Sequence, residues 1–259
     1  MRIGIRDGCL QEPWETAFKT AAQIGFDGLE IEIGANHEET LLWTCEGRTK
    51  LAQIVKASGI EVASFCAGVC WTVSPASNDP EVRRRIAKIL TAACAFAAEF
   101  QVRWILVPVT PGGEGVTPEV GTARWIEAMS SLASLANDMG VKLCLENVGG
   151  GYGKSAAELI GMVDAVASPG VGVYYDIGNA TAFGHDPVEE IETLGNRIGE
   201  VHVKDVKGEL LGEGLVRIPE SLAALRAIGY DDYLVLETPA TADPVAAATA
   251  NLSYLRKLL

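Results

Sequence analysis

Four residues that can bind metal or move protons occur where apolar runs of the sequence end. They are Glu146 in KLCLE, Asp176 in VGVYYD, His202 in VHV and Glu237 in YLVLE. A carboxylate is costly to bury unless a partner offsets its charge. Three carboxylates and one imidazole converging on one volume would resist burial, and a divalent cation would remove that cost. The set predicts a metal site, provided that the fold brings the four side chains together.

The donor types indicate both the ion and the chemistry. Oxygen-rich ligation with a single histidine suits Mn²⁺, which we favour, and also fits Mg²⁺, Co²⁺ and Zn²⁺. A cation flanked by two carboxylates is suited to proton transfer next to a carbonyl group, because it stabilises the enediolate that forms when the neighbouring carbon loses its proton. One carboxylate would remove that proton and the other would return one.

The fold must place these residues at one end of a sheet. Eight strand-length apolar runs recur along the chain, at residues 3–6, 28–33, 61–66, 104–109, 142–148, 171–177, 200–206 and 233–239. Helix-like segments lie between them, such as PWETAFKTAAQIG, with a proline near its start and Gly25 at its end. Eight such alternations predict an α/β fold in which one (β/α)8 TIM barrel forms a single domain over residues 1–259. A doubly wound open sheet would need a glycine fingerprint after an early strand, and none is present.

Strand alternation predicts the direction of each of the four side chains. In KLCLE, Leu143 and Leu145 face the helices, which turns Glu146 into the barrel. The same period turns Asp176, His202 and Glu237 inward. Barrels of this type carry their chemistry at the carboxyl ends of the strands, so the four residues are expected to meet there.

Composition and charge exclude several classes of protein. The net charge of -13 argues against binding to nucleic acid, whose phosphates require a basic surface. The N-terminus MRIGIRDGCL lacks the apolar core of a signal peptide, and no run approaches about 18 apolar residues, so we expect no membrane partner. The six cysteines follow no disulfide spacing and are expected to be reduced thiols. We therefore expect a cytoplasmic protein.

Several motifs resemble those of the xylose isomerase-like TIM barrel superfamily of sugar phosphate isomerases and epimerases. They are LENV, YYDIGN, VHVKD followed by LGEG, and VLE after GYDD, and the similarity extends over essentially the whole chain. The DIGN, HVKD and GEG elements are most similar to L-ribulose-5-phosphate and L-xylulose-5-phosphate 3-epimerases. The resemblance implies that Glu146, Asp176, His202 and Glu237 bind the metal. It also implies that Glu146 and Glu237 are the catalytic carboxylates, which exchange the C3 proton of a ketose or ketose phosphate.

The chain departs from some members of this superfamily at Asn179. Apurinic-site endonucleases and ketohexose 3-epimerases on this barrel carry histidine at that position. The only histidines here, His37, His185 and His202, are too few for the three-metal cluster of the nucleases. We expect Asn179 to contact the substrate or to adjoin the metal ligands.

Two basic residues share the inward phase of the strands. Lys204 is a candidate for binding a hydroxyl or phosphate oxygen, with a salt bridge inside the barrel, to Glu30 or Glu32, as the alternative. Arg6, at the end of the run 3–6, is a candidate anion ligand. Both are predicted to bind substrate.

The glycine-rich stretch GGGYGKS at residues 149–155 lacks the spacing of a nucleotide-binding loop. We expect a mobile loop over the substrate, with Lys154 and the following helix start as a phosphate site.

Other activities fit the same residues. An aldose–ketose isomerase would move the proton between C1 and C2, an inosose-type dehydratase would expel water, and a sensor would bind sugar and metal without turnover. Barrels of this kind commonly pair, so a homo-oligomer is also expected.

Overall fold

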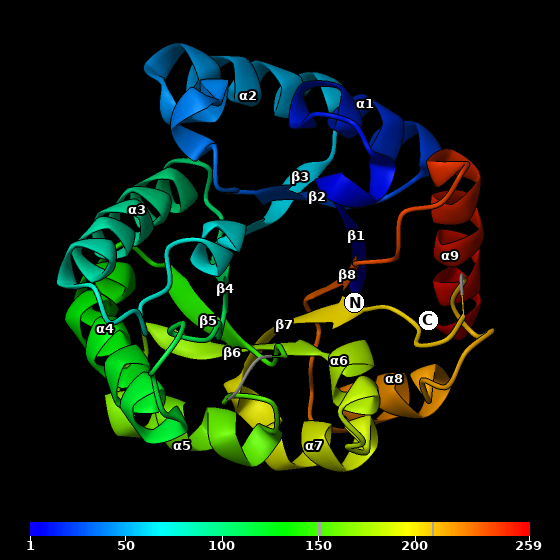
Figure 1. Cartoon of the computed structure of the whole chain (residues 1–259). Coiled ribbons are helices and arrows are strands. Elements are labelled where there is room, and N and C mark those ends of the chain that lie inside the picture. The colour runs from blue at the N-terminus through cyan, green and yellow to red at the C-terminus, as the bar shows by residue number, and fades with distance from the viewer. Residues whose placement is uncertain (150–151, 209) are drawn as a thin grey trace.

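The computed structural model describes residues 1–149, 152–208 and 210–259. Eight parallel strands form a closed barrel in sequence order, and helices surround it (Figure 1). The strands are β1 Arg2–Arg6, β2 Gly28–Glu32, β3 Glu61–Cys66, β4 Trp104–Pro108, β5 Lys142–Glu146, β6 Val171–Asp176, β7 Ile198–Val203 and β8 Tyr233–Leu236. The predicted single (β/α)8 barrel is confirmed.

The helices begin at the capping residues that the sequence suggests. Asp79 and Thr117 cap two of them, each followed by proline, and Gly25 ends another in the left-handed conformation with φ of 107°. The helices are α1 Trp14–Ile24, α2 Cys45–Ser58, α3 Pro80–Glu99, α4 Pro118–Asp138, α5 Ala156–Val166, α6 Ile177–Ala182, α7 Pro187–Leu194, α8 Ile218–Ala227 and α9 Pro244–Leu258. Helix α6 was not expected, because it follows β6 with no loop between them.

The strands separate two layers of packing. Outward-facing residues such as Leu143, Leu145 and Val173 belong to the large core shared with the helices. Inward-facing residues such as Cys144 and Tyr174 form a separate buried cluster. The alternation that predicted the inward direction of the site residues therefore holds along these strands.

In the described part of the chain, the cysteines and the helices agree with the expectations of reduced thiols and of no membrane span. All six cysteines are free thiols, and only Cys45 is exposed. Within the described ranges, no helix combines the length and apolar character needed to cross a bilayer.

Candidate metal centre

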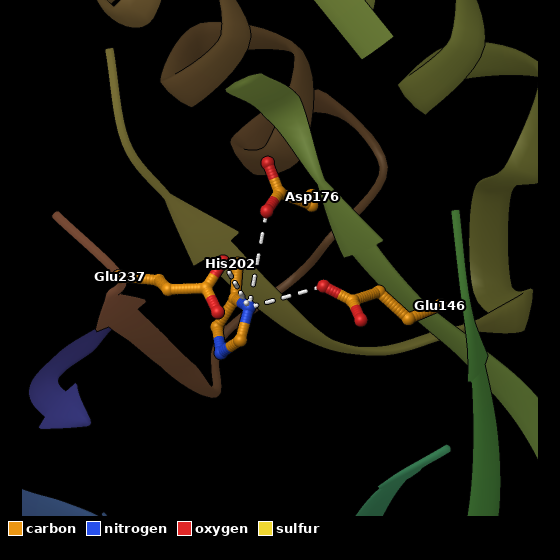
Figure 2. A group of neighbouring side chains, drawn as sticks. All are labelled: Glu146, Asp176, His202 and Glu237. Carbon is orange, nitrogen blue, oxygen red and sulfur yellow. Dashed lines mark hydrogen bonds and ion pairs between the residues drawn. The ribbon is translucent and has the colours of Figure 1, made fainter. Parts of the chain in front are cut away.

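Four adjacent strands carry a cluster of three carboxylates and one imidazole at the carboxyl end of the barrel (Figure 2). Glu146 and Asp176 are the last residues of β5 and β6, His202 lies near the end of β7, and Glu237 directly follows β8. One potential ligand atom from each side chain lies within 4.8 Å of the others. The structure thus brings together the four residues that the sequence singled out.

His202 presents one ring nitrogen to all three carboxylates. Its Nδ1 lies 3.3 Å from Glu146 Oε1, 3.5 Å from Glu237 Oε2 and 3.9 Å from Asp176 Oδ2 (Figure 2). The side chains of His202 and Asp176 are fully buried, and 20% of the Glu237 side chain is exposed. The cluster is therefore largely shielded from solvent, and Glu237 is the most exposed of its four side chains.

Glu30 on β2 determines which nitrogen of His202 faces the cluster. Its Oε1 lies 2.9 Å from His202 Nε2, and its Oε2 accepts hydrogen bonds from Ser64 Oγ at 2.7 Å and Tyr174 OH at 2.9 Å. An ionised carboxylate only accepts hydrogen bonds, so Nε2 carries a proton and donates a hydrogen bond to Glu30. Nδ1 is then the nitrogen available to a metal ion, and the ring orientation is held by the carboxylate behind it.

The carboxylates of the cluster differ in their affinity for a proton. Burial raises the pKa of Glu146 to about 7. Burial also raises the pKa of Asp176, although the nearby Lys204 ammonium opposes this. Burial alone would raise the pKa of Glu237 too, but His202 and Lys204 hold it well below its usual range. The cluster therefore contains both a carboxyl that retains a proton near neutrality and one that stays ionised.

Lys204 lies against two of the carboxylates. Its Nζ is 2.7 Å from both Asp176 Oδ2 and Glu237 Oε2. The alternative prediction of a salt bridge inside the barrel is confirmed, but the suggested partners Glu30 and Glu32 are wrong. Lys204 directly follows β7, which lies between β6 and β8, so it reaches the carboxylates of those two neighbours. The ammonium offsets part of the negative charge that these carboxylates concentrate.

Arg6 supplies a second cation from β1. Its guanidinium pairs with Glu237 and lies 3.0 Å from Glu32 Oε2. Two carboxylates therefore already engage the side chain that was predicted to bind an anion. Arg6 ends β1, which pairs with β8 on the side away from β7, so its guanidinium holds the Glu237 carboxylate from that side.

Asn179 belongs to a hydrogen-bonded clamp beside the ligands. Asp176 caps α6 by accepting a hydrogen bond from Asn179 N at 2.8 Å, and Asn179 Nδ2 donates to Asn147 O at 2.9 Å. Asn147 in turn exchanges hydrogen bonds with the backbone of Asp176, at 2.8 and 2.9 Å. The two asparagines thus hold together the carboxyl ends of β5 and β6, where Glu146 and Asp176 lie. Asn147 was not predicted, although its place directly after a strand-end glutamate was a usable signal.

The donor set fits a divalent cation. Asp176 Oδ2 is buried and has no hydrogen-bond donor of suitable geometry in the described part of the chain, although Lys204 lies close to it. Three carboxylates with one imidazole are ligands that Mn²⁺, Mg²⁺ and related ions accept. A cation at this position would reduce the repulsion among the carboxylates more than the single Lys204 ammonium does.

Comparisons with known proteins agree with this geometry. A family model described as xylose isomerase-like TIM barrel matches residues 18–258. The L-ribulose-5-phosphate 3-epimerase UlaE of Salmonella heidelberg (strain SL476) is 26% identical, over 96% of this chain and 91% of that protein. A D-tagatose 3-epimerase-like protein superposes with a TM-score of 0.84 at 25% identity, covering 100% of this chain and 98% of the other. An L-ribulose 3-epimerase superposes with a TM-score of 0.86 at 21% identity, covering 100% and 94%. The predicted resemblance and the prediction of an enzyme are confirmed.

Proposed function

Because the chain belongs to the xylose isomerase-like TIM barrel family, we propose that it is a divalent-metal-dependent epimerase that inverts C3 of a ketose or ketose phosphate. The observation that carries this proposal is the convergence of three carboxylates on His202 Nδ1 at the carboxyl end of the barrel. Similarity to UlaE, a 3-epimerase at 26% identity, favours this reaction over the others that the same residues permit.

Glu146, Asp176, His202 and Glu237 are the proposed metal ligands, and Mn²⁺ is the proposed ion. A cation held by these residues would supply Lewis-acid polarisation of the substrate carbonyl and would offset negative charge that develops next to it. His202 would contribute Nδ1, since Glu30 occupies its other nitrogen.

Glu146 and Glu237 are the proposed catalytic carboxylates. They extend from strands on either side of β6 and β7, so substrate can lie between them. One accepts the C3 proton and the other delivers a proton to the opposite face, and the two exchange roles in the reverse reaction. Lys204 and Arg6 hold the Glu237 carboxylate in place through ion pairs. Both cations and Asn179 are proposed to line the substrate site.

Further parts of the proposal follow from bulk properties. We propose one domain over residues 1–259 with a cytoplasmic location, supported by the free thiols, and a small-molecule partner rather than nucleic acid, supported by the net charge of -13. A homo-oligomer is proposed from the family resemblance alone.

Proton exchange in D₂O tests the reaction. A panel of ketoses and ketose phosphates is incubated with metal-loaded protein, and deuterium incorporation at C3 is expected for at least one member. Exchange at C1 or C2 without C3 would identify an isomerase, and loss of water with a new ketone would identify an inosose-type dehydratase. Absence of any turnover would refute the proposal in favour of a sugar-binding barrel.

Thermal unfolding tests the metal site independently of turnover. Mn²⁺ at about 100 times its Kd is expected to stabilise the chelator-treated protein by about 2.7 kcal/mol. For a chain of this size that corresponds to an increase in Tm of about 5–10 °C. No shift with any divalent ion would refute the site.

A further inference from the structure

A cavity between α3 and α4 gathers positively charged side chains outside the barrel. Its volume is about 260 Å³, and Arg83, Arg84 and Arg124 are among the residues that line it. Helices α3 and α4 stand in the outer ring of helices, whereas the proposed metal ligands converge inside the barrel (Figure 1). The cavity is therefore separate from the candidate metal centre.

The sequence concentrates cations at this place. Residues 83–88, RRRIAK, include four basic residues and no acidic one, in a chain that has 21 basic and 34 acidic residues. Among the described residues that line the cavity, Glu127 is acidic and offsets part of this charge. The positive charge that remains would attract an anion.

The segment between β3 and α3 holds two of the guanidinium groups in place. Arg83 Nη1 donates hydrogen bonds to Ser77 O at 2.6 Å and to Asn78 O at 3.2 Å. Arg124 Nη1 donates to Ala76 O at 2.8 Å and to Asn78 Oδ1 at 3.0 Å. Because the acceptors all belong to this one segment, its conformation orients both guanidinium groups together.

Arg83 and Arg124 keep donors for a ligand. A guanidinium group carries several N–H donors, and within the described residues only Nη1 of each side chain is engaged. Neither side chain has an ion pair with a carboxylate of the described chain, although both are half-buried. A bound oxyanion would supply the compensating charge that these two cations lack.

Arg84 is available to complete the site. It pairs with Glu81, three residues earlier on the same helix, and the exposed fractions of the two side chains are 58% and 76%. Exposed pairs of this kind contribute little to stability, so Arg84 can exchange Glu81 for a bound anion at small cost. The cavity can therefore offer three guanidinium groups to one ligand.

The helix start that the sequence suggested as a phosphate site is less suited to this role. Glu158 Oε2 accepts hydrogen bonds from Lys154 N at 2.8 Å and Ser155 N at 3.0 Å, so a carboxylate already engages those N–H groups. Residues 150–151 of the GGGYGKS loop lie outside the described residues. The arginine residues between α3 and α4 have no such competitor except Glu81.

Much of the remaining lining is apolar. Pro75, Pro80, Ala87 and Ala128 lie around the cavity with the three arginines. Guanidinium groups bind phosphate oxygens through paired N–H donors, and a phosphate dianion has enough charge and oxygens to engage several of them. We propose that the cavity is a second ligand site, independent of the proposed epimerase reaction, for a small phosphate monoester whose organic part packs against the apolar lining.

Isothermal titration with phenyl phosphate tests this site. The probe carries the proposed phosphate group on an apolar body, and inorganic phosphate carries the group alone. We expect phenyl phosphate to bind with a submillimolar Kd, more tightly than inorganic phosphate, and equally in Mn²⁺-loaded and chelator-treated protein. No binding at millimolar concentration, or binding only to the Mn²⁺-loaded protein, would overturn the inference. Either result leaves the epimerase proposal to the test by proton exchange.

Benzoate tests the assignment to phosphate. It keeps the apolar body but replaces the phosphate dianion with a singly charged carboxylate, so we expect weaker binding than that of phenyl phosphate. Equal or tighter binding of benzoate would overturn the assignment to a phosphate monoester.

Two neighbouring arginines on α3 provide a matched pair of variants. Arg84 lines the cavity, whereas the side chain of Arg85 lies 3.8 Å from Glu38 Oε2. Arg84→Ala is expected to raise the Kd for phenyl phosphate about tenfold, because a charged hydrogen-bond donor is lost. Arg85→Ala should leave this Kd within about twofold, since it changes only distant, screened charge. Equal effects of the two variants would show a general response to charge and overturn the inference.

Glu127→Gln is expected to act in the opposite direction. It removes the acidic group from the lining with little change in size, so phenyl phosphate should bind about twofold to fivefold more tightly. The Arg84 and Glu127 side chains are both exposed, so the variants are expected to fold like the wild type. Unchanged or weaker binding in Glu127→Gln would place the ligand elsewhere and overturn the inference.

Discussion

Glu30 and Glu200 are two carboxylates buried inside the same barrel, and they differ in what surrounds them. Both are 0% exposed. Glu30 receives hydrogen bonds from His202, Ser64 and Tyr174. Neither oxygen of Glu200 on β7 has a hydrogen-bond partner in the described part of the chain. The two residues therefore allow the effect of partners to be separated from the effect of burial.

The difference shows what makes a buried carboxylate useful to a site. Burial alone would raise the pKa of Glu30, but His202 lowers it, so Glu30 stays ionised and orients the imidazole. Burial raises the pKa of Glu200 well above its usual range, so Glu200 is held neutral. Hydrogen-bond partners offset the free-energy cost of burying the Glu30 carboxylate and fix its direction. For Glu200, which lacks such partners among the described residues, that cost is not offset.

The largest expected effect comes from the carboxylates that face the reacting atoms. Glu146→Gln and Glu237→Gln are each expected to lower C3 proton exchange by about 10²–10⁴-fold, since each removes a proton-transfer group. The circular dichroism spectrum should match that of the wild type because the barrel core is untouched. Retained activity in both variants would refute the two-carboxylate mechanism.

Glu30→Gln tests whether the partners of Glu30 serve the metal centre. The amide cannot replace the ionised acceptor that holds His202 Nε2–H, so we expect the Kd for Mn²⁺ to rise about 10–100-fold by isothermal titration. Glu200→Gln makes the same chemical change at the same burial and serves as control. An equal loss of Mn²⁺ affinity in Glu30→Gln and Glu200→Gln would contradict the inference that Glu30, and not Glu200, supports the metal centre.

Asp7 is a buried carboxylate with fewer hydrogen-bond partners than Glu30 and more than Glu200, and the pH dependence of stability can test its protonation. It is buried, accepts hydrogen bonds from Gly8 N at 2.7 Å and Glu32 N at 3.2 Å, and burial raises its pKa to about 6. The folded state therefore holds this proton more tightly than the unfolded chain, and stability falls as pH rises from about 4 to above 6. Asp7→Asn should remove about 2 kcal/mol of that fall in urea unfolding measured at both ends of the window. An unchanged pH dependence would contradict this assignment.

Glu200→Gln should have the smallest effect and the opposite sign. Glutamine is neutral without taking up a proton, so the variant avoids the free-energy cost of keeping Glu200 protonated at neutral pH, and we expect a gain of about 1 kcal/mol. For a chain of this length the Tm should rise by about 2–4 °C. Destabilisation instead would mean that Glu200 has a stabilising partner like those of Glu30.

Local patterns were sufficient for the barrel and for the inward direction of the ligands. Alternation with a period of two is a property of each strand by itself, so KLCLE and VGVYYD could be interpreted without knowledge of their neighbours. Helix α6 was missed because Asp176 both ends β6 and caps the helix, leaving no loop residues as a signal.

The sequence by itself therefore determined eight strand–helix units and the four residues that close or approach their strand ends. Only the tertiary structure decided their partners. Glu30 and His202 are 172 residues apart and meet across the interior because the sheet closes on itself. Lys204 contacts Asp176 and Glu237 because β7 lies between the strands that carry them. Such pairings depend on strand order and side-chain reach, which are properties of the closed barrel and not of any segment within it.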